Sequence, residues 1–294
     1  MSDMQALVAE ANFRGVRLLP FFETLGHSSS IGQAYPELVW CNGKQGSGLP
    51  HPFMAATWTF FDSLWREYRG VFADDQMNVG GDEIDVTCWQ SDPVIEAWMT
   101  SHNVTDLNYV ISYYYMRMAQ SLRQAGFAPI FWADAFGILN STGANLTSVG
   151  PVIFDDWDTG SPQSSAPILT APGAQVIVSS YCYLVPITIP GTFNVPNGAT
   201  WETNYRCDLA NITGVPGSAV QASMMGGHAS RWGEMTDGAC RAGRRPWRRG
   251  ACGSCTCFRT SISGVDMCVA GGCSHITTPT HLLPWMCRDQ PVPV

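Results

Sequence analysis

Residues 77–89 read MNVGGDEIDVTCW, and this stretch decides the fold prediction. A short apolar run ends at a pair of glycines, and two acids, Asp82 and Glu83, follow at once. Short apolar runs bounded by glycine are typical of buried strands. We therefore expect a strand that carries two carboxylates at its C-terminal end. The alternative is an ordinary solvated Asp-Glu pair with no chemical role.

The same order of helix, buried strand and polar residues recurs on both sides of this stretch. Helical periodicity covers 4–14, 57–72 and 107–125, and Gly15 and Gly126 are placed to end the first and third of these helices. Strand candidates are 16–22, 77–81, 128–134, 151–157, 174–184 and 219–234. Alternation of helices and buried strands predicts an α/β fold with a parallel sheet.

Aromatic and acidic residues end several of these strand candidates: Trp132, Trp157, Tyr183, Trp232 and Glu234. A (β/α)8 TIM barrel places its active site at the C-terminal ends of its strands, although a doubly wound sheet also binds ligands there. Indole and phenol rings stack on sugars, and carboxylates accept hydrogen bonds from sugar hydroxyls. The pattern predicts a carbohydrate site, while any one of these tryptophans alone could equally be a core residue.

Adjacent carboxylates suit one kind of glycoside hydrolysis better than another. A retaining enzyme with two carboxylates needs them on opposite sides of the scissile bond, roughly 5–5.5 Å apart. Asp82 and Glu83 follow one strand and are poorly placed for that. Substrate-assisted hydrolysis avoids the difficulty, because the 2-acetamido oxygen of the sugar attacks and the protein supplies one acid and one group that orients the amide.

Three motifs resemble the catalytic domain of family 20 glycoside hydrolases, the β-N-acetylhexosaminidases. They are RGVRLLPFFETLGH at 14–27, VGGDEIDVTCW at 79–89 and MGGHASRWGEMTD at 225–237. The resemblance implies a (β/α)8 barrel, with Asp82 holding the acetamido nitrogen and Glu83 serving as general acid and then base. In these roles we expect Asp82 to stay ionised and Glu83 to be protonated in a dry aromatic pocket. The substrate-binding residues it implies are His27, Trp132, Trp157, Tyr183, Trp232 and Glu234. It also implies a disulfide between Cys41 and Cys88; two unpaired thiols are the alternative, as a structural histidine is for His27.

Several features depart from the family pattern. Glu23 stands for an aspartate, His228 for a glutamate, and Val185 for an aspartate or asparagine. The chain starts before the family's third strand, so we expect an incomplete barrel over residues 1–237, without its first strands and with a last helix that departs from the pattern. Residues 238–294 form a tail rich in cysteine and arginine. A shift of reading frame in its codons would restore a sequence close to the family's last helix.

Composition limits the partners. The chain has 294 residues and a formal net charge of -8, and its acids lie mainly before residue 238, which disfavours nucleic acid. The sequence contains no long apolar span and no leader pattern at its start. Cys252, Cys255 and Cys257 do not match a standard zinc spacing, so we predict no metal and no cofactor. Glycosylation sequons at Asn103, Asn140, Asn145 and Asn211 favour a lysosomal or secreted parent protein, which could be a dimer.

The function predicted from the sequence is an exo-acting β-N-acetylhexosaminidase that removes terminal GlcNAc or GalNAc from glycoconjugates with retention. Two alternatives stay open. One is an inactive, truncated homologue that at most binds sugar, and the other is a different barrel glycosidase in which Glu234 supplies the second carboxylate.

Overall fold

The computed structural model describes residues 2–41, 44–157, 165–179, 188–189, 193–194, 217–228, 257–259 and 266–268. Two compact units divide the chain. The first comprises 1–181 and 208–228, and the second comprises 182–207 and 229–294. In the second unit the described residues form two antiparallel strand pairs, β7 (Thr188–Ile189) with β8 (Phe193–Asn194) and β10 (Cys257–Arg259) with β11 (Asp266–Cys268).

A five-stranded parallel sheet forms the centre of the first unit. Its order is β3 (Gln76–Asn78), β4 (Ala128–Trp132), β5 (Val152–Asp156), β6 (Ala174–Val178) and β9 (Met224–Gly227). Residues 16–24 run parallel to β3 on its other side, through a bridge between Phe21 and Asn78. Spatial order follows chain order, and because the strands are parallel all their C-terminal ends lie at one edge.

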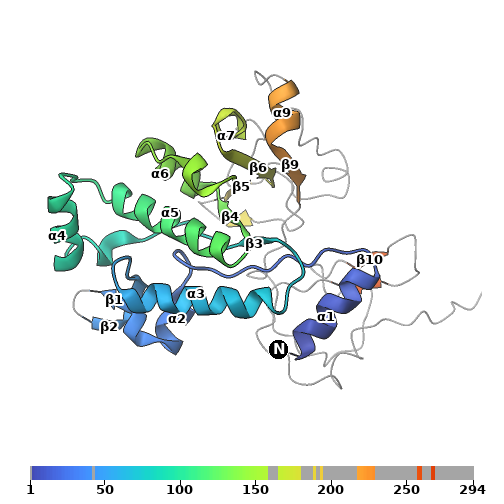
Figure 1. Cartoon of the computed structure of the whole chain (residues 1–294), viewed down its shortest axis with the longest axis horizontal. Helices are drawn as coiled ribbons and strands as arrows, with labels where there is room; N and C mark the ends of the chain where they lie inside the picture. Colours follow the sequence, from blue (N-terminus) through green and yellow to red (C-terminus); the bar gives the residue numbers. More distant parts are fainter. Residues whose placement is uncertain are drawn as a thin grey trace, which may run out of the picture. The chain divides into compact units, whose positions relative to one another are not determined.

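Helices connect successive strands and cover the outside of this sheet. Figure 1 shows α3 (Ala55–Arg69), α5 (Asn108–Gln124), α6 (Asp134–Ser141), α7 (Ala166–Thr170) and α9 (Gly217–Ser223) following one another in an arc around the strands. In α3 the buried side chains Trp58, Phe61 and Trp65 recur at helical spacing. They join the same apolar core as the inward faces of α5 and the strands.

The remaining elements of the first unit lie outside this sheet and its connecting helices. They are α1 (Ser2–Phe13), α2 (Ser29–Ala34), η1 (Pro36–Leu38), the antiparallel pair β1 (Val39–Cys41) and β2 (Lys44–Pro50), η2 (Val86–Cys88), α4 (Pro93–Ser101) and η3 (Leu146–Val149). Asp92 begins α4, where its carboxylate accepts hydrogen bonds from the backbone N–H groups of Val94 and Ile95.

The predicted helices and the parallel sheet are confirmed, with two corrections. The strand expected over 219–234 begins only at Met224, because residues 217–223 form α9. The segment 16–22 was expected to be a buried strand, but Val16, Leu19 and Phe21 are each more than a third exposed. Pro20 lacks an N–H for a ladder, and the segment lies at the edge of the described sheet.

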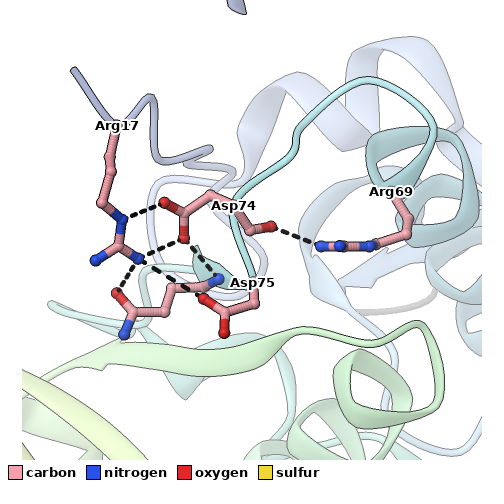
Figure 2. A network of polar contacts seen from close by, with 5 residues as sticks. Arg17, Arg69, Asp74 and Asp75 are labelled. Carbon is pink, nitrogen blue, oxygen red and sulfur yellow. Dashed lines mark hydrogen bonds and ion pairs between the residues drawn. The ribbon is translucent and has the colours of Figure 1, made fainter. Parts of the chain in front are cut away.

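A polar network around Asp74, which precedes β3, holds this edge segment at the N-terminal end of the sheet (Figure 2). Arg17 donates to both carboxylate oxygens of Asp74, at 2.7 and 2.8 Å, and Arg69 donates to the Asp74 carbonyl. Asp74 also accepts from the Gln76 N–H at the start of β3. A hollow of about 570 Å³ lies beside this network, between α1 and the residues before β3.

Candidate active site

The C-terminal edge of the sheet gathers acidic and aromatic residues from neighbouring strands. Asp82 and Glu83 follow β3, Trp132 ends β4, and Trp157 directly follows β5. Glu23 lies near the end of the edge segment on the other side of β3, and His27 lies in the loop that follows this segment. The structure therefore brings together the five predicted site residues that it describes, on three adjacent strand ends and the loop beside them.

The turn that carries the two acids has an unusual backbone. Gly80 and Gly81 have positive φ angles of 69° and 100°, which glycine adopts without strain. Glu83 has a φ of 47°, in a region that few residues other than glycine occupy. Tyr115 supports the turn from α5, because its hydroxyl donates to the Gly81 carbonyl at 2.5 Å. Residues other than glycine that are held in this left-handed region, as Glu83 is, cluster at functional sites.

The loop after Glu23 packs directly on this turn. A Cβ atom at Gly26 would lie 1.9 Å from the Asp82 carbonyl oxygen, so only glycine fits there. His27, with a φ of 41°, follows and points its Nε2 at both acids, 3.4 Å from Glu83 Oε2 and 3.7 Å from Asp82 Oδ2. The supporting position predicted for His27 near the acid is in this way consistent with the geometry.

Asp82 is buried, and its two oxygens differ. Oδ2 faces His27, whereas Oδ1 is buried and has no hydrogen-bond partner among the described residues. Burial raises the pKa of Asp82 to about 6. The charge of His27 lowers this pKa, whereas the charges of Asp134 and Glu83 raise it. The sequence led us to expect an Asp82 that stays ionised; the structure limits that to pH values above about 6.

Glu83 lies in a different environment from the one expected. A general acid was expected in a dry aromatic pocket, but the Glu83 side chain is 61% exposed. His27 Nε2 lies 3.4 Å from its Oε2, and the charge of Glu83 acts on Asp82. Water therefore reaches this carboxyl.

Trp132 is held by Glu23, which sequence reasoning noted only as a departure from the family. The indole Nε1–H donates to Glu23 Oε1 at 3.2 Å, and the Gly81 N–H donates to Glu23 Oε2 at 3.3 Å. Phe21 packs edge-on against the Trp132 ring, with centroids 5.9 Å apart. Burial raises the pKa of Glu23 to about 7, and the charge of Asp82 adds to this increase.

Trp157 is oriented by Asp134, another residue that the sequence analysis missed. Its indole Nε1–H donates to Asp134 Oδ2 at 2.9 Å, and Asp134 begins α6 directly after β4. Glu23 directly follows the strand candidate 16–22, and Asp134 is the last residue of the candidate 128–134. The rule that selected Asp82 would have selected them too.

A second polar cluster lies further along the same edge. Asp155 is buried; Ser179 Oγ donates to its Oδ1 at 2.6 Å, and His228 Nδ1 lies 3.4 Å from its Oδ2. Burial raises the pKa of Asp155 to about 7 and lowers that of His228. The histidine that replaces the family's glutamate is thus paired with an acid from β5, across β6.

Four of the predicted residues cannot be placed. Tyr183, Trp232 and Glu234 lie outside the described residues, as does the side chain of Cys41. Cys88 is disulfide-bonded, and its pairing with Cys41 stays a prediction. Within the described ranges, no group of three or more His, Cys, Asp or Glu side chains could hold a metal ion, and no helix is long and apolar enough to cross a membrane.

Comparisons with known proteins identify the family of this chain. Residues 1–254 match the sequence model of glycosyl hydrolase family 20, catalytic domain. The chain is 29% identical over 244 residues to the β-hexosaminidase subunit alpha of Rattus norvegicus, covering 80% of this chain and 43% of that protein. It is 26% identical over 243 residues to the human subunit beta, covering 80% and 41%. The chain thus spans about two fifths of the length of these relatives.

Solved structures show the same fold. A β-N-acetylhexosaminidase crystal structure superposes with a TM-score of 0.64 at 24% identity, over 79% of this chain and 50% of the other. A family 20 exo-β-N-acetylglucosaminidase from Vibrio harveyi, in complex with N-acetylglucosamine, gives 0.64 at 16% identity, over 82% and 38%. The described strands are consistent with part of a (β/α)8 barrel. The chain belongs to glycosyl hydrolase family 20, and the match is to its catalytic domain.

Proposed function

We propose that this chain carries the catalytic site of an exo-acting β-N-acetylhexosaminidase that removes terminal GlcNAc or GalNAc by substrate-assisted, retaining hydrolysis. The observation that carries the proposal is Asp82 Oδ1, a buried carboxylate oxygen without a hydrogen-bond partner among the described residues. Buried polar atoms in proteins are almost always paired, so one left over beside a left-handed turn suits an N–H supplied by a ligand. An acetamido N–H is such a donor.

The reaction follows from the two acids. Asp82 accepts the acetamido N–H and orients the amide so that its oxygen attacks the anomeric carbon. The glycosidic bond breaks, and Glu83 gives its proton to the leaving oxygen. The oxazolinium that forms carries positive charge, which ionised Asp82 stabilises. Glu83 then takes a proton from the water that opens the ring, so the product keeps the configuration of the substrate.

Other residues take supporting roles in the proposal. Trp132 and Trp157 provide aromatic walls, and both indoles have their N–H groups bound by carboxylates that fix the rings. Tyr183 would donate to the acetamido oxygen, Trp232 would complete the walls, and Glu234 would bind sugar hydroxyls. Substrate bound over Glu83 would exclude the water that now reaches it, and this would favour its protonated form.

The cellular setting is part of the same proposal. Asn103, Asn140 and Asn145, each the first residue of a glycosylation sequon, are exposed. Glycosylation there would be accommodated without disturbing the core, in line with a lysosomal or secreted protein. The matched relatives are named as subunits, which is the name of a part of an assembly. We propose that the full-length protein that carries this chain is a dimer.

Hydrolysis of an aryl β-GlcNAc by the protein that carries this chain tests the proposal. Glu83→Gln should lower kcat by about 10²–10⁴-fold, the usual contribution of a general acid. Glu67→Gln, at an exposed position of α3, is the matched control and should leave the rate unchanged. Equal rates for Glu83→Gln and the wild type would reject the assignment of the acid, and a wild type without hydrolysis would favour the sugar-binding alternative.

The other open alternative predicts a different inhibitor response. A thiazoline analogue of GlcNAc mimics the cyclic intermediate that forms only when the substrate amide attacks. Tight competitive inhibition is expected, with Asp82→Asn weakening it. An enzyme that used Glu234 as a nucleophile would hydrolyse the substrate but would not bind the thiazoline more tightly than GlcNAc itself.

A further inference from the structure

Glu23 lies where three strand ends meet, and the mechanism above gives it no role. Its carboxylate accepts from the Trp132 indole with Oε1, at 3.2 Å, and from the Gly81 backbone with Oε2, at 3.3 Å. Gly81 directly precedes Asp82, and Trp132 ends the next strand. One carboxylate thus joins the turn that bears the acids to an aromatic wall of the site.

The glycine pair is fitted to this carboxylate. A Cβ atom at Gly80 would lie 1.6 Å from Glu23 Oε2 and 2.3 Å from its carboxyl carbon. Gly80 also has a φ of 69°, so a larger residue would both strain the backbone and displace the Glu23 side chain. The space over Gly80 is filled by the longer glutamate side chain that replaces the family's aspartate.

The position of Glu23 costs folding free energy when the group is ionised. Burial and the Asp82 charge raise its pKa to about 7. The hydrogen bonds from Trp132 and Gly81 and the charge of His27 lower this pKa but do not offset the increase. A carboxyl whose pKa is raised makes the folded state less stable as it ionises. Groups kept at such a cost beside reacting groups are typical of functional sites.

We propose that Glu23 is a positioning residue that sets the direction of Asp82 relative to the face of Trp132. The inference rests on the proposed function, because it concerns the same site. Asp82 would hold the substrate amide and Trp132 its pyranose ring, so the angle between them decides whether the amide oxygen reaches the anomeric carbon. Misplacement by an ångström can cost two orders of magnitude in rate.

Glu23→Gln tests the role with little change of shape. The glutamine amide keeps one oxygen acceptor, but its nitrogen cannot accept from the second N–H donor. The kcat for the aryl β-GlcNAc should fall about tenfold or more, with a smaller change in KM. The free energy of unfolding at pH 8 should stay equal or rise, because the costly charge is gone. An unchanged kcat, or a fall in kcat matched by a loss of stability, would overturn the proposal.

Gly80→Ala provides a second test with a matched control. Gly143 has the same φ of 69° as Gly80, but nothing lies within 4 Å of its Cβ position. Gly80→Ala should lower kcat about as much as Glu23→Gln, whereas Gly143→Ala should leave kcat unchanged. In a Glu23→Ala background, Gly80→Ala should lower kcat by less, since there is no carboxylate to displace. Equal losses in the two backgrounds would contradict the proposal.

The outcomes separate this inference from the function on which it rests. If Glu83→Gln loses activity and Glu23→Gln keeps the full kcat, only the positioning role fails. If Glu83→Gln stays active, the proposed mechanism fails. If the wild-type protein neither hydrolyses the aryl β-GlcNAc nor binds the thiazoline in calorimetry, both are rejected.

Discussion

At the scale of single residues, the site is defined by two adjacent carboxyls in different environments. Asp82 is buried under the loop of Gly26, and its pKa is raised to about 6. Glu83 turns outward through a left-handed backbone, and its side chain is 61% exposed. The two adjacent residues can therefore have different roles in the proposed reaction: Asp82 orients the substrate amide, and Glu83 transfers a proton.

Asp82 should set the acid side of the pH profile. The substrate amide needs the ionised carboxylate, so kcat/KM of the free enzyme should fall about tenfold per pH unit once the pH drops below the Asp82 pKa. Asp82→Asn should lower the rate at pH 7 and remove this dependence, while Glu67→Gln should keep it. Kinetics between pH 4 and 8 check this, and an acid limb that persists in Asp82→Asn would assign it to another group.

The acidic pair and its strand were predictable from residues 77–89 because local order alone places carboxylates after a buried strand. The environments of the two acids were not predictable in this way. They depend on the contacts that Gly26 and Tyr115 make with this turn, and both residues are far from Asp82 in the sequence. The inverted exposure of Asp82 and Glu83 is a consequence of tertiary packing.

At the scale of elements, the edge segment 16–24 has a neighbouring strand of the described sheet on one side only. It joins β3 through a few backbone hydrogen bonds, and the Arg17 and Asp74 pair holds its N-terminal end (Figure 2). Helical periodicity and Gly15 predicted where α1 ends. The exposed face of the segment was not predictable, since an apolar run reads the same in the middle of a sheet and at its edge.

Removal of Arg17 should weaken this edge. Arg17 is 66% exposed, which limits the value of the pair, but Asp74 is nearly buried and would lose two of its donors. Arg17→Met should lower the free energy of unfolding by about 1 kcal/mol. Arg14→Met removes an exposed helical pair with Glu10 and should cost less than about 0.5 kcal/mol. Urea denaturation measures both, and equal losses would contradict the assignment.

At the scale of the whole molecule, two buried carboxyls, Asp82 and Asp155, and the half-buried carboxyl of Glu23 link stability to pH. The pKa is raised to about 7 in Glu23, about 6 in Asp82 and about 7 in Asp155, chiefly by burial. Each binds a proton more tightly folded than unfolded, so stability should fall as pH rises from about 4 to 7, by about 1.4 kcal/mol per unit of raised pKa. The lowered pKa values of His228, Asp74 and Asp85 act in the opposite sense.

Urea denaturation at pH 5 and at pH 8 measures this dependence. The wild-type protein should be more stable at pH 5, and Asp155→Asn, which changes no residue of the proposed chemistry, should reduce the difference. Greater stability at pH 8 than at pH 5 would show that the buried carboxyls do not govern the pH response.

The parallel α/β architecture was within reach of the sequence because its signals are local and repeat along the chain. Six strand positions were predicted, and each coincides with a described strand or with the edge segment. The links made by Glu23, Asp134 and Asp155 were missed, because each joins residues from different strands. The predicted boundary at residue 237 and the shift of reading frame beyond it stay predictions.

The requirement for the substrate's own amide tests the central claim most directly. The measurement is kcat/KM of the protein that carries this chain for an aryl β-GlcNAc and for the β-glucoside with the same leaving group. Because Asp82 is proposed to bind an acetamido group that the glucoside lacks, we predict a preference of about 10³-fold or more for the GlcNAc substrate. Comparable rates on the two substrates would contradict substrate-assisted hydrolysis and the roles given to Asp82 and Glu83.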